Sequence, residues 1–226
     1  MFISFDQVTK TYGDKTQALT DTSFKVESGE FVFLVGPSGA GKTTILRLLI
    51  HDLVPTNGTI LLDKLNIATL LKAKIPELRR QVAMVFQDFK VLFDRTVGEN
   101  VAIALEILGK PPNEITKKVK EVLQLVDLTD KINQFPVQLS AGELQRIAIA
   151  RSIVGGPKVL LADEPTGNLD PTTSWEILKI LREINKLGTT VIMATHNVDI
   201  VNSMRKRVIS MKKGKIIKDE KSGKYR

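Results

Sequence analysis

The sequence predicts an α/β protein with a mostly parallel sheet flanked by helices, an N-terminal antiparallel β subdomain and a helical subdomain. Three features predict this fold. An apolar strand runs directly into a glycine-rich loop and a helix over residues 31–50, and strand and helix patterns alternate again over residues 159–194. Residues 96–128, which lie between these two parts, have a helical pattern. We therefore expect one domain over residues 1–226, with a helical insert at about residues 88–154.

The first part of the chain is expected to form short strands. The turn-rich stretch Tyr12, Gly13 and Asp14 separates the first two of them. Phe31–Val35 is apolar at every position, which predicts a buried strand, and a helix is expected to begin near Thr43. The expected strands are residues 2–8, 23–26, 31–35, 59–62 and 82–86.

The middle of the chain is expected to be helical. Residues 96–128 have a helical pattern that Pro111 and Pro112 interrupt, because proline cannot continue a helix. A hairpin is expected around Lys213 and Gly214. The other expected elements are a helix at 143–154, a strand at 159–162, a helix at 173–187 and a strand at 190–194. The apolar face of the second half of the insert consists of Ile115, Val119, Val122, Leu123 and Val126.

The composition resembles that of a soluble globular protein and excludes some classes of site. Of the 226 residues, 42% are hydrophobic and 26% are charged. The absence of cysteine excludes disulfides and thiolate metal sites, and it suits a reducing compartment. No apolar run approaches the roughly 20 residues of a spanning helix, and no secretory signal is visible. The chain is therefore not expected to cross a membrane by itself.

The formal charge of +8 comes from the C-terminal end. Residues 1–204 carry 23 basic and 23 acidic residues, whereas residues 205–226 carry 10 and 2. A basic end can contact an anionic membrane face, or it can be a solvated, weakly ordered tail. No aromatic residue except Tyr225 is interleaved with this charge, so we expect no nucleic-acid partner.

Residues 36–44 predict a phosphate-binding loop. They lie between a buried strand and a helix, which is the context that this glycine-rich pattern requires. Glycines let the backbone approach phosphate, whose charge is favourable at a helix N-terminus. Lys42 is expected to reach the β- and γ-phosphates, and the Thr43 hydroxyl to hold Mg²⁺. The core is thus expected to be that of a P-loop NTPase. The candidate residues are Gly36, Pro37, Ser38, Gly39, Ala40, Gly41, Lys42, Thr43 and Thr44.

Two carboxylates follow the apolar strand at residues 159–162. Asp163 is at the strand end, where it can meet Mg²⁺ through water. Glu164 is expected to point to the other side of the strand, because strand side chains alternate, and so to be free to orient or deprotonate the attacking water. A solvated strand end is the simpler alternative, but the apolar run before the pair and Pro165 after it disfavour that interpretation.

The order of the motifs resembles that of the ATP-binding cassette superfamily. The phosphate loop is followed by Gln87, a loop at residues 139–143, the Asp163–Glu164 pair and His196. The loop at residues 139–143 is similar to the signature sequence of that family, and the resemblance covers nearly the whole chain. It implies that the chain is an ATPase that binds ATP and Mg²⁺.

The resemblance also implies a role for individual residues. Tyr12 matches the aromatic residue that stacks on adenine. Gln87 matches the glutamine that contacts Mg²⁺ and reports to a membrane partner. Asp170 matches the loop that crosses to a second subunit, and His196 matches the histidine that contacts the γ-phosphate. His196 and Glu164 together form the catalytic pair that the resemblance implies. The implied metal contacts are Thr43, Gln87 and, through water, Asp163.

The signature loop is expected to form a second phosphate site. Its residues lie at the start of the helix that begins near Glu143, and a helix N-terminus favours phosphate. In the family this loop completes the site of the opposite protomer, which implies a head-to-tail homodimer around two ATP molecules. Ala141 and Glu143 depart from the more usual glycine and glutamine. The residues concerned are Ser140, Ala141, Gly142 and Glu143.

Within the family, residues 86–101 resemble those of the cell-division branch. This implies a peripheral protein on the cytoplasmic face of the cell membrane, bound to an integral membrane partner with four spanning helices and an extracytoplasmic domain. Opening and closing would activate a peptidoglycan hydrolase across the membrane. The partner contact is expected near Gln87 and residues 90–100, with Phe89, Leu92 and Phe93 as an apolar groove floor. Alternatively, these three side chains pack the core of the insert.

Other functions remain open from the sequence. Residues 162–170 are similar to those of ATPases from lipoprotein-releasing systems and exporters, which gives an alternative within the same class. Soluble family members that act on DNA or ribosomes usually carry two cassettes or a long coiled-coil insert, and neither is seen. A nucleotide-dependent scaffold with little turnover is a third class, which Glu164 and His196 disfavour.

Overall fold

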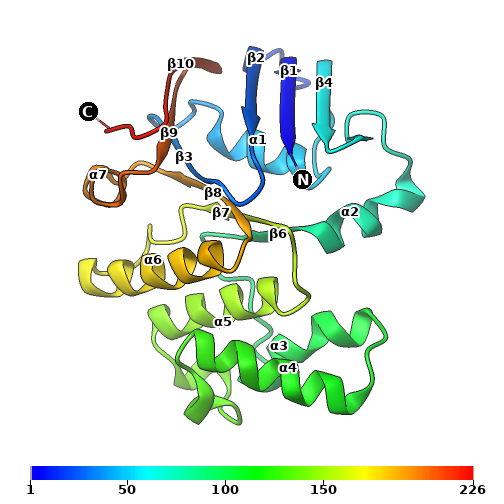
Figure 1. The fold of residues 1–226 in the computed structure, drawn as a ribbon, viewed down its shortest axis with the longest axis vertical. Helices are drawn as coiled ribbons and strands as arrows, with labels where there is room; N and C mark the ends of the chain where they lie inside the picture. The colour runs from blue at the N-terminus through cyan, green and yellow to red at the C-terminus, as the bar shows by residue number, and fades with distance from the viewer. Residues whose placement is uncertain (1, 226) are drawn as a thin grey trace.

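The computed structural model describes residues 2–225 as two sheets with helices between and below them (Figure 1). The smaller sheet is antiparallel and contains four strands in the order β2-β1-β4-β5. Its two long strands pair along most of their length, and β1 carries several bulges. The strands are β1 (Ile3–Thr11), β2 (Gln17–Val26), β4 (Asn57–Leu62) and β5 (Leu65–Asn66).

The larger sheet has six strands in the order β10-β9-β3-β8-β7-β6. The five strands from β9 to β6 are parallel, and β10 pairs antiparallel with β9. The strands are β3 (Phe31–Val35), β6 (Val82–Val85), β7 (Val159–Asp163), β8 (Thr190–Thr195), β9 (Arg207–Lys212) and β10 (Lys215–Glu220).

Seven α-helices surround the sheets in the described part of the chain. Helices α3, α4 and α5 gather below the larger sheet, and α1 lies between the two sheets (Figure 1). Short 3-10 turns lie at Lys72–Lys74, Thr129–Lys131 and Pro136–Gln138. The helices are α1 (Lys42–Leu49), α2 (Ile75–Gln81), α3 (Val97–Ile107), α4 (Pro112–Leu125), α5 (Ala141–Ile153), α6 (Pro171–Lys186) and α7 (Val198–Met204).

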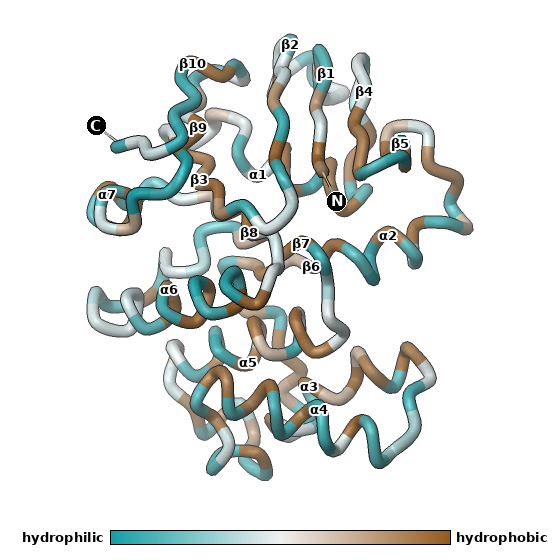
Figure 2. The backbone as a smooth tube through the Cα atoms, viewed as in Figure 1, coloured by the Kyte–Doolittle hydropathy of each residue, from teal (hydrophilic) through white to brown (hydrophobic). Residues whose placement is uncertain are grey.

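The larger sheet separates two hydrophobic cores. Because side chains alternate along a strand, Phe31, Phe33 and Val35 of β3 pack on the helices α3 to α6, whereas Val32 and Leu34 pack on α1 and the smaller sheet. A sheet covered on both faces requires continuous apolar strands, and every residue of β3 and β8 is buried. Hydrophobic segments accordingly run through the central strands in Figure 2.

Four parallel strands end at one edge of the larger sheet. The phosphate loop follows β3, His196 follows β8, Glu164 follows β7, and the segment containing Gln87 follows β6. Ligand sites of open α/β sheets lie at the carboxyl ends of their strands. The topology therefore brings candidate residues together that are up to 160 positions apart in the sequence.

The fold class that the sequence predicts is confirmed, whereas the division at residues 88–154 stays a prediction. The sequence analysis missed β5, α2 and α7, which have two, seven and seven residues. Only one residue of α2, Leu78, is buried, so no apolar face of that helix repeats along the sequence.

The C-terminal end is attached to the domain, which corrects its interpretation as a weakly ordered tail. The Tyr225 N–H donates to Asn202 Oδ1 at 2.8 Å, and Asn202 Nδ2 donates to the Tyr225 carbonyl at 3.1 Å. The Gly223 N–H donates to the Lys206 carbonyl. Within residues 2–225, no helix has the length and apolar character that crossing a membrane requires.

Candidate active site

The phosphate loop needs glycine at two positions because other chain segments approach it closely. Gly36 has φ +148°, and a Cβ there would lie 2.3 Å from the Met211 carbonyl oxygen. Gly41 has φ +104°, and its Cβ would lie 2.7 Å from the Ala18 carbonyl oxygen. The loop is therefore packed directly against β2 and β9.

Lys42 is buried at the first position of α1 and points back into the loop. Its Nζ donates to the carbonyls of Gly36 at 2.8 Å and Pro37 at 3.3 Å. The same ammonium lies 3.8 Å from Glu164 Oε1. The carboxylate that forms an ion pair with this cation is thus the one that sequence analysis assigns to catalysis.

Thr43 and Asp163 meet across the edge of the sheet. The Thr43 hydroxyl donates to Asp163 Oδ1 at 3.0 Å. Burial raises the pKa of Asp163, and the nearby Glu164 carboxylate also raises it, while the Thr43 hydrogen bond opposes both. A hydroxyl and a carboxylate side by side are hard oxygen donors, which are the ligands that Mg²⁺ prefers. These residues therefore fit the predicted metal.

Glu164 faces the phosphate loop for a different reason from the one predicted. It lies beyond the end of β7 with φ +47°, so strand alternation does not set its direction. Its backbone N–H donates to the Ala194 carbonyl, and its Oε1 lies 2.9 Å from Nδ1 of His196. Glu164 and Asp163 consequently approach the same loop, and Glu164 lies between Lys42 and His196.

Gln87 is held against the loop that precedes α6. Its Nε2 donates to Asn168 Oδ1 at 3.3 Å, and Asn168 Nδ2 donates to the Gln87 carbonyl at 3.4 Å. A Cβ on Gly167 would lie 3.1 Å from Gln87 Nε2, which shows how closely the two loops approach. Sequence reasoning did not find this role for Asn168, because the partners are 81 residues apart.

A cavity of about 650 Å³ collects most of the candidate residues. Tyr12 lies at its side, with its hydroxyl 3.4 Å from Thr44 Oγ1 and Lys10 Nζ 5.7 Å from its ring centroid. The sequence analysis missed Thr16, Gln17 and Ala18, which also line the cavity. The predicted residues that line it are Tyr12, Pro37, Ser38, Gly39, Ala40, Gly41, Lys42, Thr43, Thr44, Gln87, Glu164 and His196.

The signature loop lies outside this cavity and lines another one. Ser140 caps α5, since its Oγ accepts from the Glu143 N–H and its own N–H donates to Glu143 Oε2 at 2.8 Å. This hydrogen bond from Ser140 lowers the pKa of Glu143. A glutamate at position 143 thus closes a capping box with Ser140, as a glutamine can, so this departure leaves the start of the helix intact.

Asp170 is placed next to the signature loop, not next to the phosphate loop. Its Oδ1 accepts from the Thr173 N–H at 3.0 Å and so caps α6. A Cβ on Gly142 would lie 2.4 Å from Thr173 Cγ2. A second cavity is lined by Ser140, Gly142, Glu143 and Thr173 but by none of the phosphate-loop residues. Within one chain, the two candidate phosphate sites are therefore separate.

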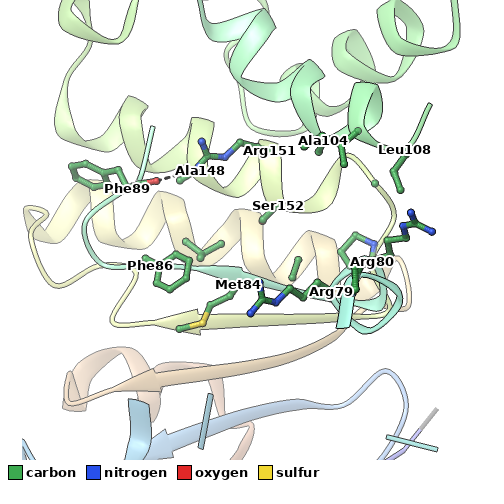
Figure 3. A pocket seen from close by; sticks show the side chains of 16 residues that line it. Arg79, Arg80, Met84, Phe86, Phe89, Ala104, Leu108, Ala148, Arg151 and Ser152 are labelled. Atoms are coloured by element: carbon green, nitrogen blue, oxygen red, sulfur yellow. Dashed lines mark hydrogen bonds between the residues drawn. The ribbon is translucent and has the colours of Figure 1, made fainter. Parts of the chain in front are cut away.

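A groove lies between α2 and α5, next to the segment that contains Gln87 (Figure 3). We call it the α2–α5 groove, and it is lined by residues of α2, β6, α3 and α5 together with Phe86 and Phe89. Phe89 lines it, but Leu92 and Phe93 do not, which corrects the predicted groove floor. Phe93 is 56% exposed, and the Leu92 backbone is bonded to Asn100.

The family model described as "ABC transporter" matches residues 19–167. The chain therefore belongs to the ATP-binding cassette (ABC) transporter family, and the predicted ABC ATPase is confirmed. The chain is 53% identical over 223 residues to the "Cell division ATP-binding protein FtsE" of Bacillus subtilis (strain 168), with 99% of this chain and 98% of the relative covered. It is 45% identical over 212 residues to the FtsE of Escherichia coli (strain K12), with 94% of this chain and 96% of that relative covered.

Solved structures are also similar to the chain. One is the dimeric structure of a post-hydrolysis state of the ATP-binding cassette MJ0796 bound to ADP and Pi. Its sequence is 33% identical to this chain, the TM-score is 0.88, and the match covers 99% of this chain and 100% of the MJ0796 chain. CbiO1 of Clostridium perfringens is part of the ABC transporter complex cbiONQ. It is 33% identical to this chain with a TM-score of 0.91, and the match covers 97% of this chain and 88% of CbiO1.

Proposed function

We propose that this chain is the ATP-hydrolysing subunit of a membrane complex that acts in cell division, with an integral membrane partner resembling FtsX. Sequence identity of 45–53% over 94–99% of the chain to proteins named FtsE carries this proposal. The candidate catalytic residues also lie together at one edge of the larger sheet. In this function the complex transmits a conformational change that activates a peptidoglycan hydrolase, and it transports no substrate.

The site supports ATP hydrolysis by this chain. Backbone N–H groups of the phosphate loop and the Lys42 ammonium bind the phosphates. Mg²⁺, held with ATP by Thr43, Asp163 and Gln87, would neutralise phosphate charge. The Glu164 carboxylate accepts a proton from the water that attacks the γ-phosphate, and His196 fixes its orientation through the Nδ1 contact. Tyr12 supplies a face for adenine at the side of the cavity.

The separation of the two candidate phosphate sites supports a head-to-tail dimer. Ser140, Gly142 and Glu143 of the signature loop cannot complete the phosphate loop of their own chain, because they line a different cavity. A second copy related by twofold symmetry supplies them, and Asp170 lies on the same surface. Two ATP molecules would then be bound between the protomers.

The membrane partner docks in the α2–α5 groove, and the complex lies on the cytoplasmic face of the cell membrane. The groove adjoins the segment that contains Gln87, so an occupant there can influence the phosphate site. The basic C-terminal end is on the opposite side of the molecule in Figure 1, which disfavours it as a direct lipid contact when the groove faces the membrane.

Export or lipoprotein release is the second candidate function. The resemblance of residues 162–170 to those of such ATPases favours it. The similarity to a protein that is part of the transporter complex cbiONQ supports a transport role without giving its direction. The test is to purify the chain from detergent-solubilised membranes of its own host and to identify its partner. A partner with four spanning helices and an extracytoplasmic domain, without a transport cavity, supports the cell-division role. A partner with a substrate pathway assigns the chain to an exporter and leaves its ATPase chemistry intact.

A further inference from the structure

The backbone directly after Gln87 is strained. Phe89 and Lys90 both have a left-handed conformation, with φ +54° and +53°. Residues with a Cβ rarely adopt this conformation, and they do so as single residues more readily than in succession. The Lys90 N–H donates to the Asp88 carbonyl at 2.5 Å, so the chain turns tightly at this point. Such a backbone persists only where the surrounding structure stabilises it.

Arg151 makes the contact that stabilises this turn. It lies in the last turn of α5, and its side chain extends toward Phe89 (Figure 3). Its NH2 group donates to the Lys90 carbonyl at 2.7 Å and to the Phe89 carbonyl at 3.4 Å. These carbonyls belong to the two left-handed residues. Hydrogen bonds from a charged donor are stronger than those between neutral groups, so Arg151 can offset part of the backbone strain.

Ion pairing does not explain the place of Arg151. Burial lowers the pKa of Arg151, and no carboxylate within residues 2–225 opposes this effect. Other partly buried arginines of the chain, such as Arg146 and Arg207, are paired with carboxylates instead. A buried cation whose partners are neutral carbonyls has a desolvation cost. We therefore look for its role in the segment that it holds.

The parts of the chain on either side of this turn are held by other residues. Asn168 exchanges two hydrogen bonds with Gln87 on one side. On the other side, the fully buried Asn100 makes four hydrogen bonds to the backbone between residues 92 and 96. Residues 89 and 90 lie between these two anchors, and Arg151 attaches them to α5.

We propose that Arg151 is a positioning residue for Gln87: its bonds to Phe89 and Lys90 stabilise the left-handed turn that keeps the Gln87 side chain in the phosphate cavity. This inference rests on the proposed contact of Gln87 with Mg²⁺. Gln87 lines the phosphate cavity and Arg151 does not, so Arg151 acts through the backbone of residues 88–90. Without Arg151 the turn relaxes, and Gln87 is no longer held at the metal.

The test measures binding of a non-hydrolysable fluorescent ATP analogue to the free chain over a range of Mg²⁺ concentrations. The readout is the Mg²⁺ concentration that gives half of the maximal gain in affinity, so it does not depend on turnover. Arg151→Gln removes the contact, and Gln87→Ala removes the side chain that it positions. Lys90→Gly makes the left-handed conformation accessible without Arg151. Arg182→Gln, which changes an exposed arginine of α6, is the matched control. Melting temperatures establish that each variant is folded.

The proposal predicts that Arg151→Gln raises this Mg²⁺ concentration about tenfold, because a left-handed residue without its hydrogen bond is disfavoured by about that factor. Arg182→Gln has no effect. Gln87→Ala raises the concentration at least as much, and adding Arg151→Gln to it changes nothing further, since Arg151 acts through Gln87. In the Arg151→Gln protein, Lys90→Gly restores the concentration to within about twofold of wild type. Arg205→Gly, at the left-handed C-cap of α7, restores nothing.

The other outcomes separate the inference from the function on which it rests. If Gln87→Ala raises the Mg²⁺ concentration but Arg151→Gln does not, the inference alone is refuted. Additive effects of these two substitutions also refute it, because Arg151 would then act independently of Gln87. If Lys90→Gly restores nothing, or no more than Arg205→Gly, the left-handed turn is not what Arg151 supports. A Gln87→Ala protein that behaves like wild type refutes the proposed metal contact and the inference together.

Discussion

Gly214 offers a way to disturb the phosphate loop without touching a residue that binds the nucleotide. It forms the turn between β9 and β10, where its N–H donates to the Ala40 carbonyl at 3.1 Å. Its carbonyl accepts from the Thr20 N–H at 2.9 Å and from the Thr22 hydroxyl at 3.0 Å. One residue thus holds β2 and the phosphate loop in a fixed relation.

The structure gives the size of the effect expected for Gly214→Ala. Gly214 has φ +74°, a conformation that costs other residues about 1 kcal/mol. The added Cβ would lie 2.7 Å from the Ala18 carbonyl oxygen, which is backbone and cannot rotate away. The turn must therefore shift and weaken about two of its three hydrogen bonds, each worth about 1 kcal/mol. The expected loss of unfolding free energy is about 3 kcal/mol, or a melting temperature lower by roughly 6–12 °C.

Gly109→Ala is the matched control for this experiment. Gly109 has φ +67°, but a Cβ there meets nothing within 4 Å. It should lose only about 1 kcal/mol of unfolding free energy and keep its ATP affinity. Gly214→Ala should in addition bind a fluorescent ATP analogue about tenfold more weakly, because Ala18 and Ala40 both line the cavity.

The comparison of the two variants can refute this reasoning. Equal losses of stability in thermal melts would mean that the contact with Ala18 is relieved without cost. Unchanged ATP affinity of a clearly destabilised Gly214→Ala protein would mean that the turn supports the fold but does not position the phosphate loop.

Two further predictions concern the phosphate loop and the C-terminal end. Lys42→Ala should abolish ATP binding, measured with labelled ATP, because no other cation among residues 2–225 is hydrogen-bonded to the loop carbonyls; undiminished binding would contradict the assigned site. Deleting residues 221–226 should lower the unfolding free energy by about 3 kcal/mol, at about 1 kcal/mol for each hydrogen bond lost. It removes the two bonds between Asn202 and Tyr225 and the bond from the Gly223 N–H to the Lys206 carbonyl. Lys224→Gln, which keeps those bonds, should melt like wild type, and equal melting of the deletion would restore the loose-tail interpretation.

The sequence was sufficient to predict those helices and strands whose pattern of apolar residues or prolines lies within the element itself. The bounds of β3 are those predicted, because both faces of the strand are covered and every residue is apolar. The two halves of the helical region separate at Pro111 and Pro112, as expected, since α3 ends at Ile107 and α4 begins at Pro112. By contrast, α2 and α7 are short and mostly unpatterned, and their positions depend on tertiary contacts.

The arrangement of the site depends on contacts between segments that are far apart in the sequence, and the sequence of one segment does not predict such contacts. The sequence indicated Glu164 but not its direction, which a left-handed backbone and His196 determine. The contact of Gln87 with Asn168 and that of Arg151 with Lys90 join segments more than 60 residues apart. Their residue types gave no signal of these pairings.

The dimeric state of Glu164→Gln in ATP tests the central claim, that two copies enclose ATP between the phosphate loop of one and the signature loop of the other. This substitution keeps the shape of residue 164 but removes the carboxylate that accepts a proton from water. Size-exclusion chromatography with light scattering should show a dimer in ATP and Mg²⁺ and a return to monomer when ATP is replaced by ADP. A Glu164→Gln protein that binds ATP yet stays monomeric would contradict the head-to-tail arrangement.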